Sequence, residues 1–141
     1  MSNNKYYDIP SYDFEPTKDK INVISTHDKG QGLQSLVSLS KGDIVFKFSG
    51  TIQYEQSLYT LQVKPNIYIY DPIIMGKVLH SCDPNMYCNM NDFTFIAIKD
   101  IKAGDLLLMD YEQTEDYLYN IFDCNCLNNN CKGLIRGKLN H

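Results

Sequence analysis

Short apolar segments, separated by polar turn-forming residues, recur along the chain. The segments are rich in β-branched and aromatic side chains, which favour strands. They occupy residues 21–26, 33–39, 44–48, 67–70, 93–98 and 106–109. The pattern predicts a mostly β fold with only a few short helices.

Two of these segments follow nearly the same turn. Residues 39–46 read LSKGDIVF and residues 101–108 read IKAGDLLL, so a Gly-Asp pair precedes an apolar strand in each. Two copies are too few for a repeat array, and we interpret them as similar turns in one domain. The one helix that we expect lies around residues 113–121, where Tyr117, Leu118 and Ile121 form an apolar stripe.

Size and composition indicate a single intracellular domain. The 141 residues suffice for about one core, and the net charge of −4 is opposite to that of a dedicated nucleic-acid binder. No apolar run reaches the ~20 residues that span a bilayer, and the first residues lack the features of a signal peptide. We therefore expect a cytoplasmic or nuclear protein that contacts neither membrane nor nucleic acid directly.

The cysteines carry the clearest chemical signal. Cys124, Cys126 and Cys131 form a C-x-C-x4-C pattern. Disulfides are rare in a reducing interior, so clustered thiols indicate a metal site, and zinc takes four such ligands. The fourth ligand must come from elsewhere in the chain, and spacing does not choose between the two remaining cysteines and two histidines: Cys82, Cys88, His80 and His141. The alternative is a loop of reduced thiols without metal.

Four motifs in one order carry a resemblance to a known family. They are KGQGLQSLVSLSKGDIVFKFSG (29–50), HSCDPN (80–85), FIAIKDIKAGDLLLMDY (95–111) and FDCNCLNNNCKGLI (122–135). Over roughly residues 21–137 the chain resembles the SET domain of S-adenosylmethionine-dependent protein-lysine methyltransferases, with the cysteine-rich post-SET tail. The resemblance implies small curved sheets, a knot-like C-terminal segment and a zinc-binding post-SET loop.

The resemblance also implies a division of the chain. Residues 1–20 would be a strap over the surface or a loose tail, residues 21–121 the SET domain, and residues 122–141 the post-SET tail. A protein or peptide bearing lysine would be the substrate, with a histone suggested by analogy only. The protein would act as a monomer or a homodimer.

Individual residues take roles from the same resemblance. Tyr111 would place its hydroxyl near the transferring methyl group, and Tyr68 would supply a second hydroxyl to the lysine channel. Cys82 would be the fourth ligand of one structural Zn²⁺, which leaves Cys88 as a buried strand thiol. The S-adenosylmethionine site would comprise Lys29, Gly30, Gln31, Gly32, His80, Tyr111, Phe122 and Leu134.

The chain departs from the family pattern at several positions. Leu79 stands where the family has an asparagine that holds the amino acid end of the cofactor, and Lys77 is the nearest cation in the sequence. Phe48 replaces a channel tyrosine, and Met109 occupies a position associated with the number of methyl groups added. Two alternatives to a lysine methyltransferase follow: a SET-like protein-binding module without catalysis, and a methyltransferase of a small amine or a non-lysine side chain.

Overall fold

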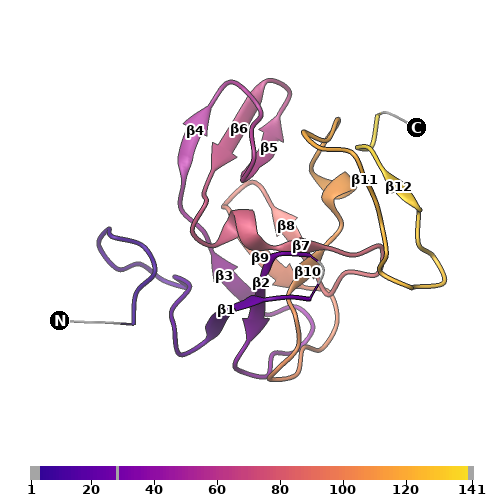
Figure 1. Ribbon diagram of the computed structural model, residues 1–141. Helices are drawn as coiled ribbons and strands as arrows, with labels where there is room; N and C mark the ends of the chain where they lie inside the picture. The colour runs from indigo at the N-terminus through magenta and orange to yellow at the C-terminus, as the bar shows by residue number, and fades with distance from the viewer. Residues whose placement is uncertain (1–3, 28, 140–141) are drawn as a thin grey trace.

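The computed structural model describes residues 4–27 and 29–139, and its regular structure is almost entirely extended (Figure 1). Within these residues the only helices are two short 3-10 turns, η1 (Met75–Lys77) and η2 (Tyr111–Gln113). The expected mostly β fold is therefore confirmed. The strands are β1 (Ile21–Ser25), β2 (Gln31–Ser35), β3 (Ile44–Lys47), β4 (Thr51–Gln53), β5 (Thr60–Lys64), β6 (Ile67–Tyr70), β7 (Leu79–His80), β8 (Met86–Asn89), β9 (Thr94–Ala97), β10 (Leu108–Met109), β11 (Phe122–Asp123) and β12 (Leu134–Ile135).

The strands form five small sheets rather than one large one. Two sheets have three strands, in the orders β3-β9-β8 and β4-β6-β5, and the others are the pairs β1–β2, β11–β12 and β7–β10. In Figure 1 the β4-β6-β5 sheet stands at the top and the β11–β12 pair lies at the right. The β7–β10 pair is parallel, which requires a long connection between its strands. This pair makes neighbours of segments some thirty residues apart.

An aromatic cluster fills the middle of the core. Phe46, Phe48 and Phe95 are each at most 2% exposed, and their ring centroids lie 5.0–6.4 Å apart in pairs. Phe93 packs against Phe48 at 5.6 Å. Burying each such ring stabilises the fold by roughly 1.5–3 kcal/mol, and the rings come from β3, β9 and the residues adjacent to these strands.

The two Gly-Asp turns have the same geometry, as the sequence predicts. The side chain of Asp43 accepts the N–H of Ser40 at 2.8 Å, and that of Asp105 accepts the N–H of Lys102 at 2.9 Å. The intervening glycines have φ of +95° and +100°, a region that favours glycine. The residues before the two turns, Leu39 and Ile101, form an isolated antiparallel bridge with each other.

Most predicted strands form with slightly shorter ends, but the predicted helix over 113–121 is wrong. Its backbone groups bond elsewhere: the carbonyl of Tyr117 accepts from the Gln56 side chain at 2.7 Å, and the N–H of Leu118 donates to Arg136 at 2.8 Å. Tyr117 and Ile121 are more than half exposed, so the apolar stripe has no surface to pack on. No described helix is long and apolar enough to cross a membrane.

The described N-terminal residues, 4–20, are held against the sheets by tyrosine hydroxyls. Tyr6 donates to the carbonyl of Ile21 at 2.6 Å, and Tyr7, which is 5% exposed, donates to the carboxylate of Asp71 at 2.5 Å. The same carboxylate accepts the N–H of Met75 at 2.9 Å. The segment thus contacts the loop that leads into η1 and, beyond it, into β7.

Candidate functional site

The β7–β10 pair assembles the centre of the site. Because Met109 lies opposite His80 in the parallel register, the next residue but one, Tyr111, reaches the His80 ring. The backbone N–H of Tyr111 donates to His80 Nδ1 at 3.0 Å, and the two ring centroids are 5.1 Å apart. A histidine from the middle of the chain and a tyrosine thirty-one residues later therefore form one contact.

Hydrogen bonding fixes the protonation of His80. Its Nδ1 accepts the bond from Tyr111, so the ring proton lies on Nε2, which is 3.4 Å from the Sγ of Cys82. Burial lowers the pKa of His80, and the nearby carboxylate of Asp110 opposes this effect. The neutral imidazole thus connects Tyr111 to a cysteine.

Four cysteine sulfurs converge beside this histidine. The Sγ atoms of Cys82, Cys124, Cys126 and Cys131 all lie within 4.8 Å of one another, and those of Cys82 and Cys124 are 3.8 Å apart. A tetrahedral thiolate site with metal–sulfur distances of about 2.3 Å separates its sulfurs by about 3.8 Å. The donor set and its spacing fit a metal ion.

The loop around Cys82 is held by the tail as well as by the sulfurs. The side chain of Asn130 donates to the carbonyl of Cys82 at 2.9 Å, and the N–H of Lys132 donates to its Sγ at 3.2 Å. Cys88, by contrast, lies in β8 with 3% exposure and its Sγ near Met90. His141 lies outside the described residues. Among the candidates for the fourth ligand, the structure brings Cys82 to the other three sulfurs.

The tail brings a second aromatic ring to the site. Phe122 begins β11, two residues before Cys124, and pairs with Ile135 of β12. Its ring centroid lies 5.6 Å from that of His80 and 6.0 Å from that of Tyr111, edge-on to both. The three rings form one cluster, and its outer member depends on the position of the tail.

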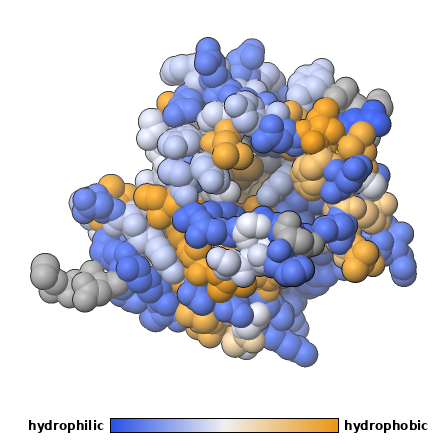
Figure 2. All heavy atoms as spheres, viewed as in Figure 1, coloured by the Kyte–Doolittle hydropathy of each residue, from blue (hydrophilic) through white to orange (hydrophobic). Residues whose placement is uncertain are grey.

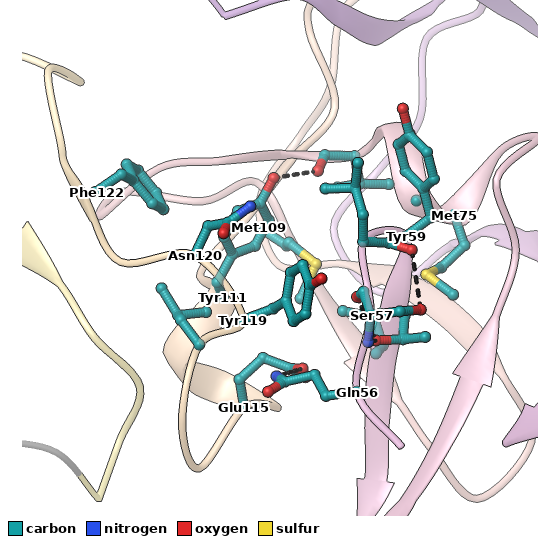
Figure 3. Close-up of a pocket in the computed structure, with 16 residues that line it drawn as sticks. Gln56, Ser57, Tyr59, Met75, Met109, Tyr111, Glu115, Tyr119, Asn120 and Phe122 are labelled. Atoms are coloured by element: carbon teal, nitrogen blue, oxygen red, sulfur yellow. Dashed lines mark hydrogen bonds between the residues drawn. The ribbon is translucent and has the colours of Figure 1, made fainter. Parts of the chain in front are cut away.

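Tyr111 and Phe122 separate two cavities. A cavity of about 370 Å³ is lined by Lys29, His80 and both of these rings. Another, of about 190 Å³, is lined by the same two rings with Val78, Met109 and residues of the 56–61 and 115–120 segments (Figure 3). The two rings contribute to both linings, so they form the partition.

The Tyr111 hydroxyl is fixed at this partition. It donates to the carbonyl of Val78 at 2.7 Å. Burial raises the pKa of Tyr111, and the carboxylate of Glu115 raises it further, so the hydroxyl keeps its proton at neutral pH. The oxygen remains available as an acceptor.

Comparison with known proteins identifies this arrangement. The model of the SET domain family matches residues 30–112, more than half of the chain. The chain belongs to the SET domain family. The match includes β7, β10 and Tyr111, and it ends before the cysteine-rich tail.

Several relatives support the assignment. Methyltransferase flvH of Aspergillus flavus is 32% identical over 107 residues, which cover 74% of this chain and 60% of that protein. A histone-lysine N-methyltransferase of Chaetomium globosum, specific for H3 lysine 36, is 27% identical over a match that covers 84% of this chain and 16% of that protein. The methyltransferase domain of human histone-lysine N-methyltransferase SETMAR has the same fold, with a TM-score of 0.64 at 21% identity over 83% of this chain and 58% of that one. The chain thus spans 60% or less of the length of each.

Four of the eight predicted cofactor residues line the larger cavity. Lys29, His80, Tyr111 and Phe122 line it, whereas Gln31 and Leu134 do not. Gly30, with φ of +75°, and Gly32 lie in the turn and strand beside it. A Cβ on Gly32 would come within 2.6 Å of the Leu79 side chain, so the absence of a side chain is required there.

Tyr68 is not among the residues that line the smaller cavity, and its role as a second channel hydroxyl stays a prediction. In β6 it pairs with Gln53 and Gln62, and its hydroxyl lies near carboxylates: burial raises the pKa of Tyr68, and Glu115 and Asp116 raise it further.

Two other tyrosines, Tyr59 and Tyr119, line this cavity. Sequence reasoning missed both. Tyr59 has φ of +71°, and Tyr119 lies in the segment that fails to form a helix, so neither belongs to a regular pattern.

The departures from the family pattern differ in their structural consequences. Leu79 is 9% exposed, packs over Gly32 and lines the larger cavity, so the side of that cavity facing it is apolar. Phe48 belongs to the aromatic core and lines neither cavity at the partition. Met109 is 1% exposed and lines the smaller cavity. Lys29 rather than Lys77 is the cation in the larger lining.

Replacing Cys82 by serine is expected to abolish stoichiometric metal binding, because the other three sulfurs lie in one tail loop and lose the ligand that connects them to β7. Elemental analysis of the purified variant measures this. Cys88→Ser is the matched control and should retain the metal, since Cys88 lies outside the cluster. Equal metal content in the two variants would contradict the assignment.

Proposed function

We propose that this SET domain is an S-adenosylmethionine-dependent protein-lysine N-methyltransferase. The observation that carries the proposal is the partition: Tyr111 and Phe122 line two cavities of different size at once. A group transferred between two bound molecules needs this geometry, because the reacting atoms must meet in line while each molecule keeps its own site.

The larger cavity suits the cofactor. Its volume of about 370 Å³ is within the range of small-molecule sites, roughly 300–1,000 Å³. The glycines at 30 and 32 keep side chains away from one edge, and Lys29 offers a positive charge for a carboxylate. When bound, S-adenosylmethionine supplies a methyl group made electrophilic by its sulfonium.

The smaller cavity suits one side chain of a protein or peptide. At about 190 Å³ it is below the range of cofactor sites, and Val78, Met109 and Leu61 give it apolar walls. Next to Val78 and Met109, such walls disfavour an ammonium, so they lower the pKa of a lysine amine at that point and favour its neutral, nucleophilic form. The Tyr111 oxygen, held by Val78, would accept weak C–H···O contacts at the point of transfer.

A structural Zn²⁺ is the ion that best fits the four sulfurs. Four cysteines leave no open position for a substrate, which is typical of structural zinc sites. Held by Cys82 and the tail cysteines, the ion would fix Phe122 against Tyr111. Its role is therefore to maintain the partition rather than to react.

Leu79 favours a second candidate, a SET-like module that binds a protein without catalysis. Loss of a hydrogen bond to a charged group costs about 1.5–3 kcal/mol, or a tenfold to hundredfold loss of cofactor affinity. The relatives named above as methyltransferases weigh toward the enzyme. We propose an intracellular protein, monomeric or homodimeric, with a protein substrate such as a histone and with no direct nucleic-acid contact.

Tyr111→Phe tests the proposed activity. With methyl-labelled cofactor and histone H3 or lysine-containing peptides, the wild type should transfer label and the variant should lose roughly a hundredfold in kcat. Calorimetry should show nearly unchanged cofactor binding. Tyr87→Phe, an exposed tyrosine of β8 outside both cavities, is the control. A wild type that binds no cofactor at millimolar concentration would refute the proposal.

Leu79→Asn tests whether Leu79 faces the cofactor's amino acid end. Restoring an amide there should raise the affinity for S-adenosylmethionine about tenfold, because a charged group gains a hydrogen-bond partner. Titration calorimetry measures the gain. Leu79→Ala removes the leucine side chain without adding an amide and should give none. If the asparagine variant binds no more tightly than the alanine variant, Leu79 does not face that end.

A further inference from the structure

Glu115 is the only carboxylate among the described residues that line the smaller cavity. Its side chain comes from the segment after η2, and the residue is 3% exposed. Figure 3 shows Glu115 beside Gln56 at one end of the lining, with Tyr119 and Tyr111 next to them. No lysine, arginine or histidine is part of this lining in the described chain.

The carboxylate is held in place by neutral donors. The backbone N–H of Gln62 donates to Oε2 at 2.7 Å, and the side chain of Gln56 donates to Oε1 at 3.2 Å. These bonds fix the orientation of the group, but they do not neutralise it. Each oxygen has further acceptor capacity for a donor in the cavity.

Comparison with the other buried glutamates shows what Glu115 lacks. Glu15 is 7% exposed and pairs with Lys5 at 2.6 Å, and Glu112 is 6% exposed and pairs with Lys132 at 3.1 Å. Among the described residues, no cation lies within salt-bridge distance of Glu115, the most buried of the three. Buried carboxylates are normally paired, so this one is arranged for a partner that enters the cavity.

Among residues 4–27 and 29–139, no ion pair with a lysine, arginine or histidine is formed by Glu115. The described titratable groups whose charges act on Glu115 include two tyrosines, a thiol and a carboxylate: Tyr68, Tyr111, Cys88 and Asp116. Burial raises the pKa of Glu115, partly opposed by its hydrogen bonds from the Gln62 N–H and the Gln56 side chain. An entering cation would favour the ionised form and lower that pKa.

We propose that Glu115 is the specificity-determining residue of the smaller cavity: its carboxylate pairs with the ammonium end of an entering side chain, so the cavity selects a primary alkylamine over a neutral group of equal size. The inference rests on the proposed function for its biological meaning. Because methyl transfer itself needs the neutral amine, the pairing acts on entry and affinity, and it should affect KM more than kcat.

Binding of n-butylammonium, compared with 1-butanol of similar size, tests the proposal without any methyl transfer. NMR shifts of the Gln62 amide, which donates to the carboxylate, report occupancy at the site. The wild type should bind n-butylammonium about tenfold more tightly than 1-butanol, and Glu115→Gln should lose this preference. Asp116→Asn, which removes a neighbouring charge outside the lining, should keep it.

A pH titration of the wild type provides a second measurement that needs no variant. Affinity for n-butylammonium should fall as the pH is lowered through the raised pKa of Glu115, because protonation removes the negative charge, while affinity for 1-butanol should stay constant. Equal affinities for the two probes, no detectable binding of either, or an unchanged preference in Glu115→Gln would each overturn the proposal. Selective binding without methyl transfer by the wild type would leave it standing and refute the methyltransferase instead.

Discussion

Convergence of four cysteine sulfurs is the constraint that connects the tail to the rest of the site. Three belong to a tail with almost no regular structure of its own, and the fourth, Cys82, follows β7 in the middle of the chain. The tail has few buried apolar side chains to hold it, and Leu127 beside the cluster is 92% exposed. The sulfur cluster therefore positions the tail in place of a hydrophobic core, together with hydrogen bonds such as those that the Arg136 and Gly137 N–H groups donate to the Glu112 carboxylate.

That position matters because Phe122 lies two residues before the first tail cysteine. The β7–β10 pairing places Tyr111 on His80 through backbone register, independently of the tail. Phe122 completes the partition from the tail side, edge-on to both rings. The parallel strand pair thus positions Tyr111, and the cysteine cluster positions Phe122, in the partition that both rings form. Each adjoining cavity has its own electrostatic character, with Lys29 in the larger lining and Glu115 in the smaller.

Features carried by local patterns could be predicted from the sequence, and features created by irregular backbone could not. The Gly-Asp turns, the aromatic strands and the cysteine motif can each be recognised from a few consecutive residues. Tyr59, Tyr119 and Glu115 reach the smaller cavity from loops, and no periodicity marks them. Tyr68 illustrates the limit: its role as a channel hydroxyl stays a prediction, because it lies outside the lining of the smaller cavity but close to Glu115, which belongs to that lining.

The central proposal is that a metal ion bound by the four sulfurs holds the tail and so maintains a cofactor site, and calorimetric titration of S-adenosylhomocysteine before and after chelation tests it most directly. If the four sulfurs position Phe122 as described, removal of the ion should weaken binding by about tenfold or more, since one wall of the site is then free to move. Restoring zinc should restore affinity. Unchanged affinity in the fully metal-free protein would contradict the account.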